Sequence, residues 1–266
     1  MAQIASILDI NMAEIPTFLF VERPPVVVRA TFDKDTPPKT LHYFAIQGLG
    51  ELPRLCLEYT GTPYNSVMYF KTTVHKQFSP FGQMPCYQGP ELGEGVYLAQ
   101  SSAICRHIAR ETGIAGTSPA DAAMQDMLWE AGKDIAAKKE ALHAKEVNPQ
   151  LDALLQGLIK LQKEGKCLGT GNRRFGGASA LGYGEIGVFH ALYTFRLIKA
   201  EFMASYPDLL RFMNAAASAP SIAAYLQSPR RMPLTENEVG KGHSGAGGYK
   251  YMSEPKAESF AEEYTP

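Results

Sequence analysis

The sequence predicts an α+β protein in which a domain of strands and helices precedes a domain built only from helices. Two observations lead to this prediction. From about Thr40 the chain shows a βαβ pattern that continues into a Gly-rich hairpin, whereas from Pro119 to about Gln227 its apolar residues recur at helical spacing. With 266 residues, the chain is long enough for each of two domains to bury a hydrophobic core.

The first domain is expected to begin with a strand, a helix and a second strand. The apolar run from Leu41 to Ile46 predicts a buried strand, and Gly48 and Gly50 predict the turn that follows it. A helix is expected from Pro53 to Tyr59, because proline is tolerated in the first turn of a helix. The second strand is expected near Ser66 to Phe70.

A hairpin and a helix complete the predicted first domain. The segments Pro85 to Tyr87 and Val96 to Leu98 flank a Gly-rich stretch, which is typical of two strands joined by a loop. Ser101 or Ser102 can cap the next helix, and Gly113 ends it. A βαβ unit followed by a hairpin and a helix is the element order of a thioredoxin-like domain.

The second domain is expected to consist of helices. Apolar residues along one side of Asp121 to Ala144 predict one long helix, and Asn148-Pro149 supplies an N-cap and a first-turn proline for the next. The stretch from Ile186 to Leu192 is apolar on most faces and predicts the central buried helix. Pro207 and Pro220 each fit the first turn of a further helix.

We expect four segments along the chain. They are an N-terminal extension at residues 1–38, the thioredoxin-like domain at 39–117, the helical domain at 118–235 and a C-terminal tail at 236–266. Two pairs of prolines interrupt the extension, so we expect an extended arm there. The Gly-rich tail from Glu238 onward carries many lysines and glutamates and predicts a loosely held segment.

Composition excludes several classes of protein. The net charge of −1 gives no overall field that would attract nucleic acid or an anionic membrane. No apolar run approaches the roughly 20 residues that span a bilayer, and no secretory or transit peptide is evident. The cysteines lack metal-ligand spacing, so we expect free thiols, no metal site and a cytoplasmic protein; they are Cys56, Cys86, Cys105 and Cys167.

Three motifs occur in a fixed order in the first domain. Tyr43 ends the first apolar run, Gln83-Met84-Pro85 follows in a strand context, and Gln100-Ser101 opens a helix. With these motifs the chain resembles, from about Lys39 to Pro229, a glutathione transferase of the tyrosine type, closest to the sigma and pi classes. The resemblance implies that the chain uses glutathione as co-substrate and joins its thiolate to small hydrophobic electrophiles, or catalyses a glutathione-dependent isomerisation or peroxide reduction, as in detoxification.

The resemblance assigns the catalytic role to Tyr43. The thiol of free glutathione has a pKa of about 8.5, and lowering it by two units needs about 2.7 kcal/mol of preferential stabilisation. One phenol hydrogen bond to an anion supplies about 1.5–3 kcal/mol, so a single tyrosine is sufficient. The family's arginine near the thiol is replaced here by Leu49. Arg54, one turn into the next helix, could compensate for it, but we expect Arg54 to be a solvated helix residue. We therefore expect either weaker catalysis than in the family or a site that only binds glutathione.

Other residues would bind glutathione by the same resemblance. A cis peptide bond at Pro85 would turn the main chain of Met84 toward the cysteine main chain of the tripeptide. Ser101, at a helix N-terminus, suits the γ-glutamyl carboxylate, and Lys76 would reach the glycine carboxylate. The implied set is Phe70, Lys76, Gln83, Met84, Pro85, Gln100 and Ser101.

Four of these residues also have a purely structural interpretation. Tyr43 could be a core residue, Pro85 an ordinary trans proline and Ser101 a helix cap. Lys76 could be a surface lysine. At Phe70 the family often places a tryptophan, and a phenyl ring cannot donate the indole hydrogen bond.

The resemblance also implies a homodimer. Asp134 matches an aspartate that reaches across the dimer to the γ-glutamyl amine, although on its own it is better interpreted as an exposed helix charge. The electrophile pocket is expected around Trp129 and the stretch from Lys133 to Ala144.

A second hypothesis is a non-catalytic scaffold, an interaction subunit that docks to a larger assembly through its terminal extensions. Leu49, Phe70 and the two extensions favour it.

Overall fold

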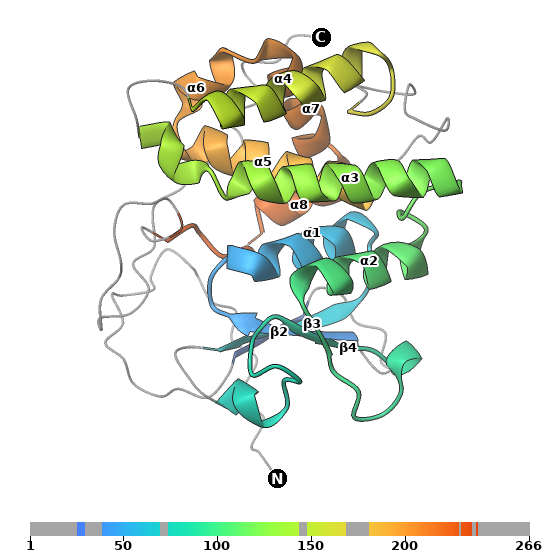
Figure 1. The fold of residues 1–266 in the computed structure, drawn as a ribbon. Coiled ribbons are helices and arrows are strands. Elements are labelled where there is room, and N and C mark those ends of the chain that lie inside the picture. The colour runs from blue at the N-terminus through green and yellow to red at the C-terminus, as the bar shows by residue number, and fades with distance from the viewer. Residues whose placement is uncertain are drawn as a thin grey trace. The chain divides into compact units, whose positions relative to one another are not determined.

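A computed structural model of the chain describes residues 26–29, 39–69, 74–143, 148–168, 181–228, 230–235 and 238. These residues form two compact units (Figure 1). The first contains the described residues up to Ile108 and those from Gln227 onward, and the second runs from Ala109 to Leu226.

The first unit is built on a mixed sheet. Its described strands are β1 (Val26–Arg29), β2 (Lys39–Phe44), β3 (Tyr64–Tyr69), β4 (Cys86–Gln88) and β5 (Leu98–Ala99). They lie in the order β1-β3-β2-β4-β5, with β2 parallel to β3 and the other neighbours antiparallel. The parallel β2–β3 pair and the antiparallel β4–β5 hairpin confirm the predicted thioredoxin-like order.

Helices of the first unit cover one face of this sheet (Figure 1). Beyond β2, the 3-10 helix η2 (Gly48–Gly50) leads directly into α1 (Glu51–Tyr59), which buries Leu52, Leu55 and Cys56. The 3-10 helices η3 (Val74–Gln77) and η4 (Pro90–Leu92) precede α2 (Ser101–Thr112). Helix α1 begins at Glu51, two residues before the predicted start at Pro53, because Glu51 and Leu52 are also helical.

The second unit is helical throughout its described residues. Ser118 caps α3 by accepting a hydrogen bond from the Asp121 N–H at 3.2 Å, and Asn148 caps α4 through the Gln150 N–H at 3.0 Å. The first residues of α7 and α8 are the predicted prolines. The helices are α3 (Pro119–Ala136), η5 (Lys139–His143), α4 (Pro149–Lys163), α5 (Tyr183–Ile198), α6 (Ala200–Ala204), α7 (Pro207–Ala217) and α8 (Pro220–Leu226).

The expected continuous helix from Asp121 to Ala144 is wrong in its second part. The α-helix ends at Ala136, and the chain continues as the 3-10 helix η5. The Lys199 ammonium donates a hydrogen bond to the Leu142 carbonyl at 3.0 Å, and Leu142 is buried. This contact joins the 3-10 helix to a residue 57 positions further along the chain, so local helix propensity could not indicate it.

Two glycines allow α3 and α5 to pack closely. A Cβ at Gly132 would lie 2.8 Å from the carbonyl carbon of Gly187, so only glycine permits this separation of the two backbones. Trp129 is 0% exposed beside the same crossing, and its ring lies 5.3 Å from that of Tyr183. The prediction that Trp129 lines the electrophile pocket is therefore wrong, because the indole is part of the core of the second unit.

All four cysteines are free, as predicted, and all four are buried. None of the helices among the described residues combines the length and apolar character needed to cross a bilayer.

Candidate functional site

A pocket of about 350 Å³ opens in the first unit. It brings together five residues predicted from two separate motifs, namely Gln83, Met84, Pro85, Gln100 and Ser101. The remaining lining residues are Phe44, Leu49, His75 and Gly82. Strand β2, the loop before β4 and the start of α2 therefore meet at one site.

The backbone on one side of the pocket is fixed by a buried serine. The Met84–Pro85 peptide bond is cis, as predicted. The Ser79 hydroxyl donates to the Gln83 carbonyl at 2.5 Å and accepts from the Gln83 N–H at 3.0 Å. These two bonds hold the segment that presents Gln83 and Met84 to the pocket.

Gln100 faces this segment from the other side. Its φ of 73° lies in the left-handed region, which is uncommon for a residue with a side chain and is often found at functional sites. Its side-chain amide donates to the Gln83 side-chain oxygen at 3.4 Å. Ser101 then starts α2, so helical N–H groups and the positive end of the helix dipole would face an anion that binds here.

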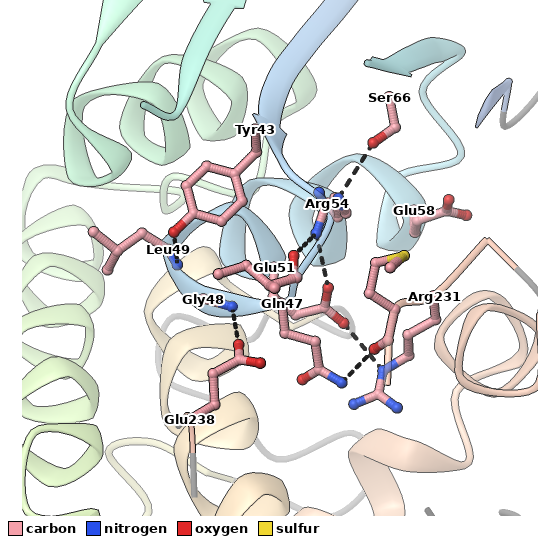
Figure 2. Close-up of polar contacts among 12 residues, drawn as sticks. Tyr43, Gln47, Gly48, Leu49, Glu51, Arg54, Glu58, Ser66, Arg231 and Glu238 are labelled. Carbon is pink, nitrogen blue, oxygen red and sulfur yellow. Dashed lines mark hydrogen bonds and ion pairs between the residues drawn. The ribbon is translucent and has the colours of Figure 1, made fainter. Parts of the chain in front are cut away.

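The side chain of Tyr43, at the end of β2, packs against the turn formed by Gly48 to Gly50. Figure 2 shows its hydroxyl directed to the backbone of Leu49. The Leu49 N–H donates to the hydroxyl oxygen at 3.0 Å, and the side chain is 6% exposed. Among the described residues, Leu49 lines the pocket and Tyr43 does not.

The electrostatics keep the Tyr43 hydroxyl protonated. Burial raises the pKa of Tyr43, and this effect outweighs the Leu49 N–H and the charge of Arg54, which both lower it. The oxygen already accepts one hydrogen bond, so the hydroxyl proton can be donated to a ligand.

The expectation that Arg54 is solvated is wrong. Arg54 is 1% exposed, and its guanidinium donates to the Ile46 carbonyl at 2.9 Å and to the Ser66 hydroxyl at 3.3 Å. Glu51, one turn earlier on α1, lies 3.5 Å away and forms an ion pair with it. The Arg54 guanidinium carbon also lies 5.9 Å from the centroid of the Tyr43 ring.

Three further residues complete the predicted site, namely Lys76, Phe70 and Asp134. Lys76 is exposed on η3, beside the pocket wall, with its Cγ 3.9 Å from where a Cβ at Gly82 would stand. Phe70 lies outside the described residues. Asp134 is exposed on α3 in the second unit.

Sequence reasoning missed His75. It lines the pocket at 7% exposure, packs edge-on against Phe44 with ring centroids 5.6 Å apart, and its Nδ1 has no hydrogen-bond partner within the described ranges. The indication in the sequence was its position directly before Lys76, a residue predicted to bind glutathione.

A thioredoxin-like unit with a cis-proline pocket, followed in sequence by an all-helical unit, defines the class of thioredoxin-like glutathione-binding proteins. Two family models agree with this assignment. The glutathione S-transferase N-terminal domain matches residues 39–110, and the glutathione S-transferase C-terminal domain matches residues 123–229. The two matches together span more than half of the chain, which therefore belongs to the glutathione S-transferase family.

Individual relatives are similar over most of their length. The chain is 28% identical over 203 residues to a class-mu 26 kDa glutathione S-transferase of Fasciola hepatica, covering 73% of this chain and 88% of the relative. It is 26% identical over 212 residues to glutathione S-transferase P of Bos taurus, covering 77% and 99%. A glutathione S-transferase structure from Caenorhabditis elegans matches with a TM-score of 0.58 at 24% identity, over 74% of this chain and all of that one, and supports the fold.

Proposed function

We propose that this protein joins the thiolate of glutathione to small hydrophobic electrophiles, with Tyr43 as the group that stabilises the thiolate. The observation that carries the proposal is the pocket that unites Gln83-Met84-Pro85 with Gln100-Ser101 in a chain of this family. Glutathione-dependent isomerisation or peroxide reduction would use the same thiolate.

The tripeptide would lie along the pocket with its γ-glutamyl end at α2. Its carboxylate suits Ser101 and the helix N-terminus, and the side chains of Gln83 and Gln100 offer further polar contacts. The main chain of Met84 would pair with the main chain of the cysteine residue. The glycine carboxylate would lie toward Lys76, with His75 as an additional donor; Phe70 stays a predicted contact.

Catalysis would follow from a neutral phenol next to a buried cation. The Tyr43 hydroxyl donates a hydrogen bond to the glutathione sulfur, so the thiol loses its proton to solvent more readily. The thiolate lone pair then forms a sulfur–carbon bond, and the leaving group departs with the electrons of its former bond. Leu49 contributes no side-chain charge, so Tyr43 would supply most of the stabilisation. The charge of Arg54, which lowers the pKa of Tyr43, would add a smaller contribution.

The proposal includes a homodimer in which Asp134 of one copy reaches the γ-glutamyl amine bound by the other. An exposed carboxylate on α3 is available for such a contact. The electrophile would bind beside residues Lys133 to His143 of the helical domain. The domain limits at 39–117 and 118–235, and docking to a larger assembly through residues 1–38 and 236–266, also stay predictions.

Replacing the phenol tests the assignment. The variant Tyr43→Phe should be retained on immobilised glutathione like the unaltered chain, while its turnover of a chlorodinitrobenzene falls about ten- to a hundredfold, the loss of one hydrogen bond to an anion. Tyr206→Phe, which removes a hydroxyl that binds Asp152 in the second unit, serves as the control. Full turnover by Tyr43→Phe would remove the role. Binding without turnover by the unaltered chain would favour the non-catalytic scaffold.

A further inference from the structure

The last described residues of the chain pack against the turn that carries Leu49. We call residues 230–235 and 238 the C-terminal strap. Within it, Glu238 is 9% exposed, and one of its carboxylate oxygens accepts a hydrogen bond from the Gly48 N–H (Figure 2). The other oxygen accepts from the Thr235 N–H and hydroxyl, both at 2.8 Å. Both oxygens of this buried carboxylate are therefore engaged.

Consecutive amides of the turn connect Glu238 to Tyr43. The Gly48 N–H donates to Glu238, and the next N–H along the chain, that of Leu49, donates to the Tyr43 hydroxyl at 3.0 Å. A displacement of Gly48 would therefore move the amide that orients the phenol.

The strap holds the same turn on both sides of Gly48. Before it, the Gln47 side chain donates to the Met232 carbonyl at 2.6 Å, and both residues are buried. After it, the Arg231 guanidinium donates to Glu51 at 3.0 Å. These two contacts hold the residues on either side of the turn, and Glu238 holds the Gly48 N–H within it.

We infer that Glu238 is a positioning residue for Tyr43: it holds the Gly48–Gly50 turn so that the Leu49 N–H binds the phenol oxygen and the phenol proton points to the glutathione sulfur. The inference rests on the proposed role of Tyr43. It explains how the hydroxyl is oriented in a chain that has Leu49 where its family has an arginine. The negative charge of Glu238 also raises the pKa of Tyr43 and so favours the protonated phenol.

A carboxylate is needed at this position. Burial raises the pKa of Glu238, and hydrogen bonds from Gly48 and Thr235 oppose that rise. Glutamine offers one accepting oxygen, whereas two N–H groups face the two oxygens of Glu238. Glu238→Gln should therefore fold and keep only one of these two hydrogen bonds, and Glu238→Ala keeps neither.

The test measures the pKa of the thiol of bound glutathione, followed by the ultraviolet absorbance of the thiolate, together with kcat and KM. In Glu238→Ala and Glu238→Gln we expect the thiol pKa to rise and kcat at neutral pH to fall about three- to tenfold, as expected for one lost hydrogen bond, with the KM for glutathione within about twofold. Arg230→Gln is the matched control, because it removes the strap's ion pair with Glu58 at 2.7 Å and leaves the turn untouched.

Combination with Tyr43→Phe separates positioning from general stabilisation. If Glu238 acts through the phenol, Glu238→Ala should have no further effect on the thiol pKa in a Tyr43→Phe background. An unchanged thiol pKa in a folded Glu238→Ala variant, which keeps neither hydrogen bond, would overturn the inference, as would a rise in KM alone. If Glu238→Ala does not fold, an unchanged thiol pKa together with unchanged kcat in Glu238→Gln would overturn it. Should the unaltered chain leave the thiol pKa at its free value, the proposed function itself fails first.

Discussion

Leu49 contributes to the candidate site through its backbone. Its side chain cannot provide the charge that an arginine would bring, but its N–H binds the Tyr43 oxygen at 3.0 Å. A hydrogen bond of this kind contributes about 0.5–1.5 kcal/mol net, less than a nearby cation offers to a thiolate. The site therefore orients the phenol well while supplying little additional positive charge.

The conformation of Gly48 decides whether this arrangement can form. Its φ of +40° disfavours any side chain, and a Cβ would lie 2.5 Å from the Tyr43 hydroxyl oxygen. We expect Gly48→Ala to displace the phenol and lower turnover about tenfold or more, because the hydrogen bond to the sulfur is lost. Steady-state kinetics with glutathione and a chlorodinitrobenzene measure this.

Gly61→Ala is the matched control for backbone strain. Gly61 has a φ of +65° but no atom within 4 Å of its would-be Cβ. Both variants should lose about 1–2 kcal/mol of stability from the left-handed conformation, and only Gly48→Ala should lose turnover. Equal turnover in the two variants would contradict the contact between the turn and Tyr43.

At the scale of single elements, local sequence patterns predicted the strands and helices that depend mainly on neighbouring residues. Strand β2, the β4–β5 hairpin and the proline-started helices followed from an apolar run, turn residues and helix caps. The five pocket residues were implied by the resemblance to the family, which rests on the short motifs that contain them; they are Gln83, Met84, Pro85, Gln100 and Ser101.

Contacts between distant residues were not predictable in this way. The side chain of Arg54 is buried because Glu51, Ser66 and a backbone carbonyl surround it, and only Glu51 is its helix neighbour. Glu238 fell in a segment expected to be loosely held, yet it is buried against a turn 190 residues earlier. The contact of Lys199 with Leu142 in η5 likewise joins residues far apart in the sequence.

The α3–α5 crossing gives a prediction at this scale. Gly132→Ala would place a Cβ within 2.8–2.9 Å of the backbone of Gly187 and Val188, so the helices must separate, at a cost of about 1–3 kcal/mol. Gly157→Ala, on an exposed part of α4 with nothing within 4 Å, should instead stabilise by about 0.5–1 kcal/mol. Urea unfolding followed by the fluorescence of Trp129, the single tryptophan, reports both. A neutral Gly132→Ala would show that the crossing is looser than described.

At the scale of the whole molecule, the chain returns to its first compact unit after completing the second. Residues from Gln227 onward join the unit formed by β1 to α2, although the sequence placed residues up to 235 with the helical domain. The return is anchored by charge: Glu51 is 0% exposed and binds Arg231, which lies 180 residues further along the chain. Residues near the end of the chain thus help to satisfy a carboxylate at the start of α1.

Removing Arg231 should therefore destabilise the first unit. Breaking a buried pair leaves a desolvated charge and costs about 3–5 kcal/mol; Arg54 still lies 3.5 Å from Glu51, so we expect about 3 kcal/mol for Arg231→Met. The measurement is pulsed thiol labelling of Cys56, a buried residue of α1, across a urea series with peptide mass spectrometry. Arg211→Met breaks an exposed pair with Asp208 and should cost about 1 kcal/mol or less. If Cys56 became reactive at the same urea concentration in both variants, the end of the chain would contribute no more to the first unit than a surface ion pair does.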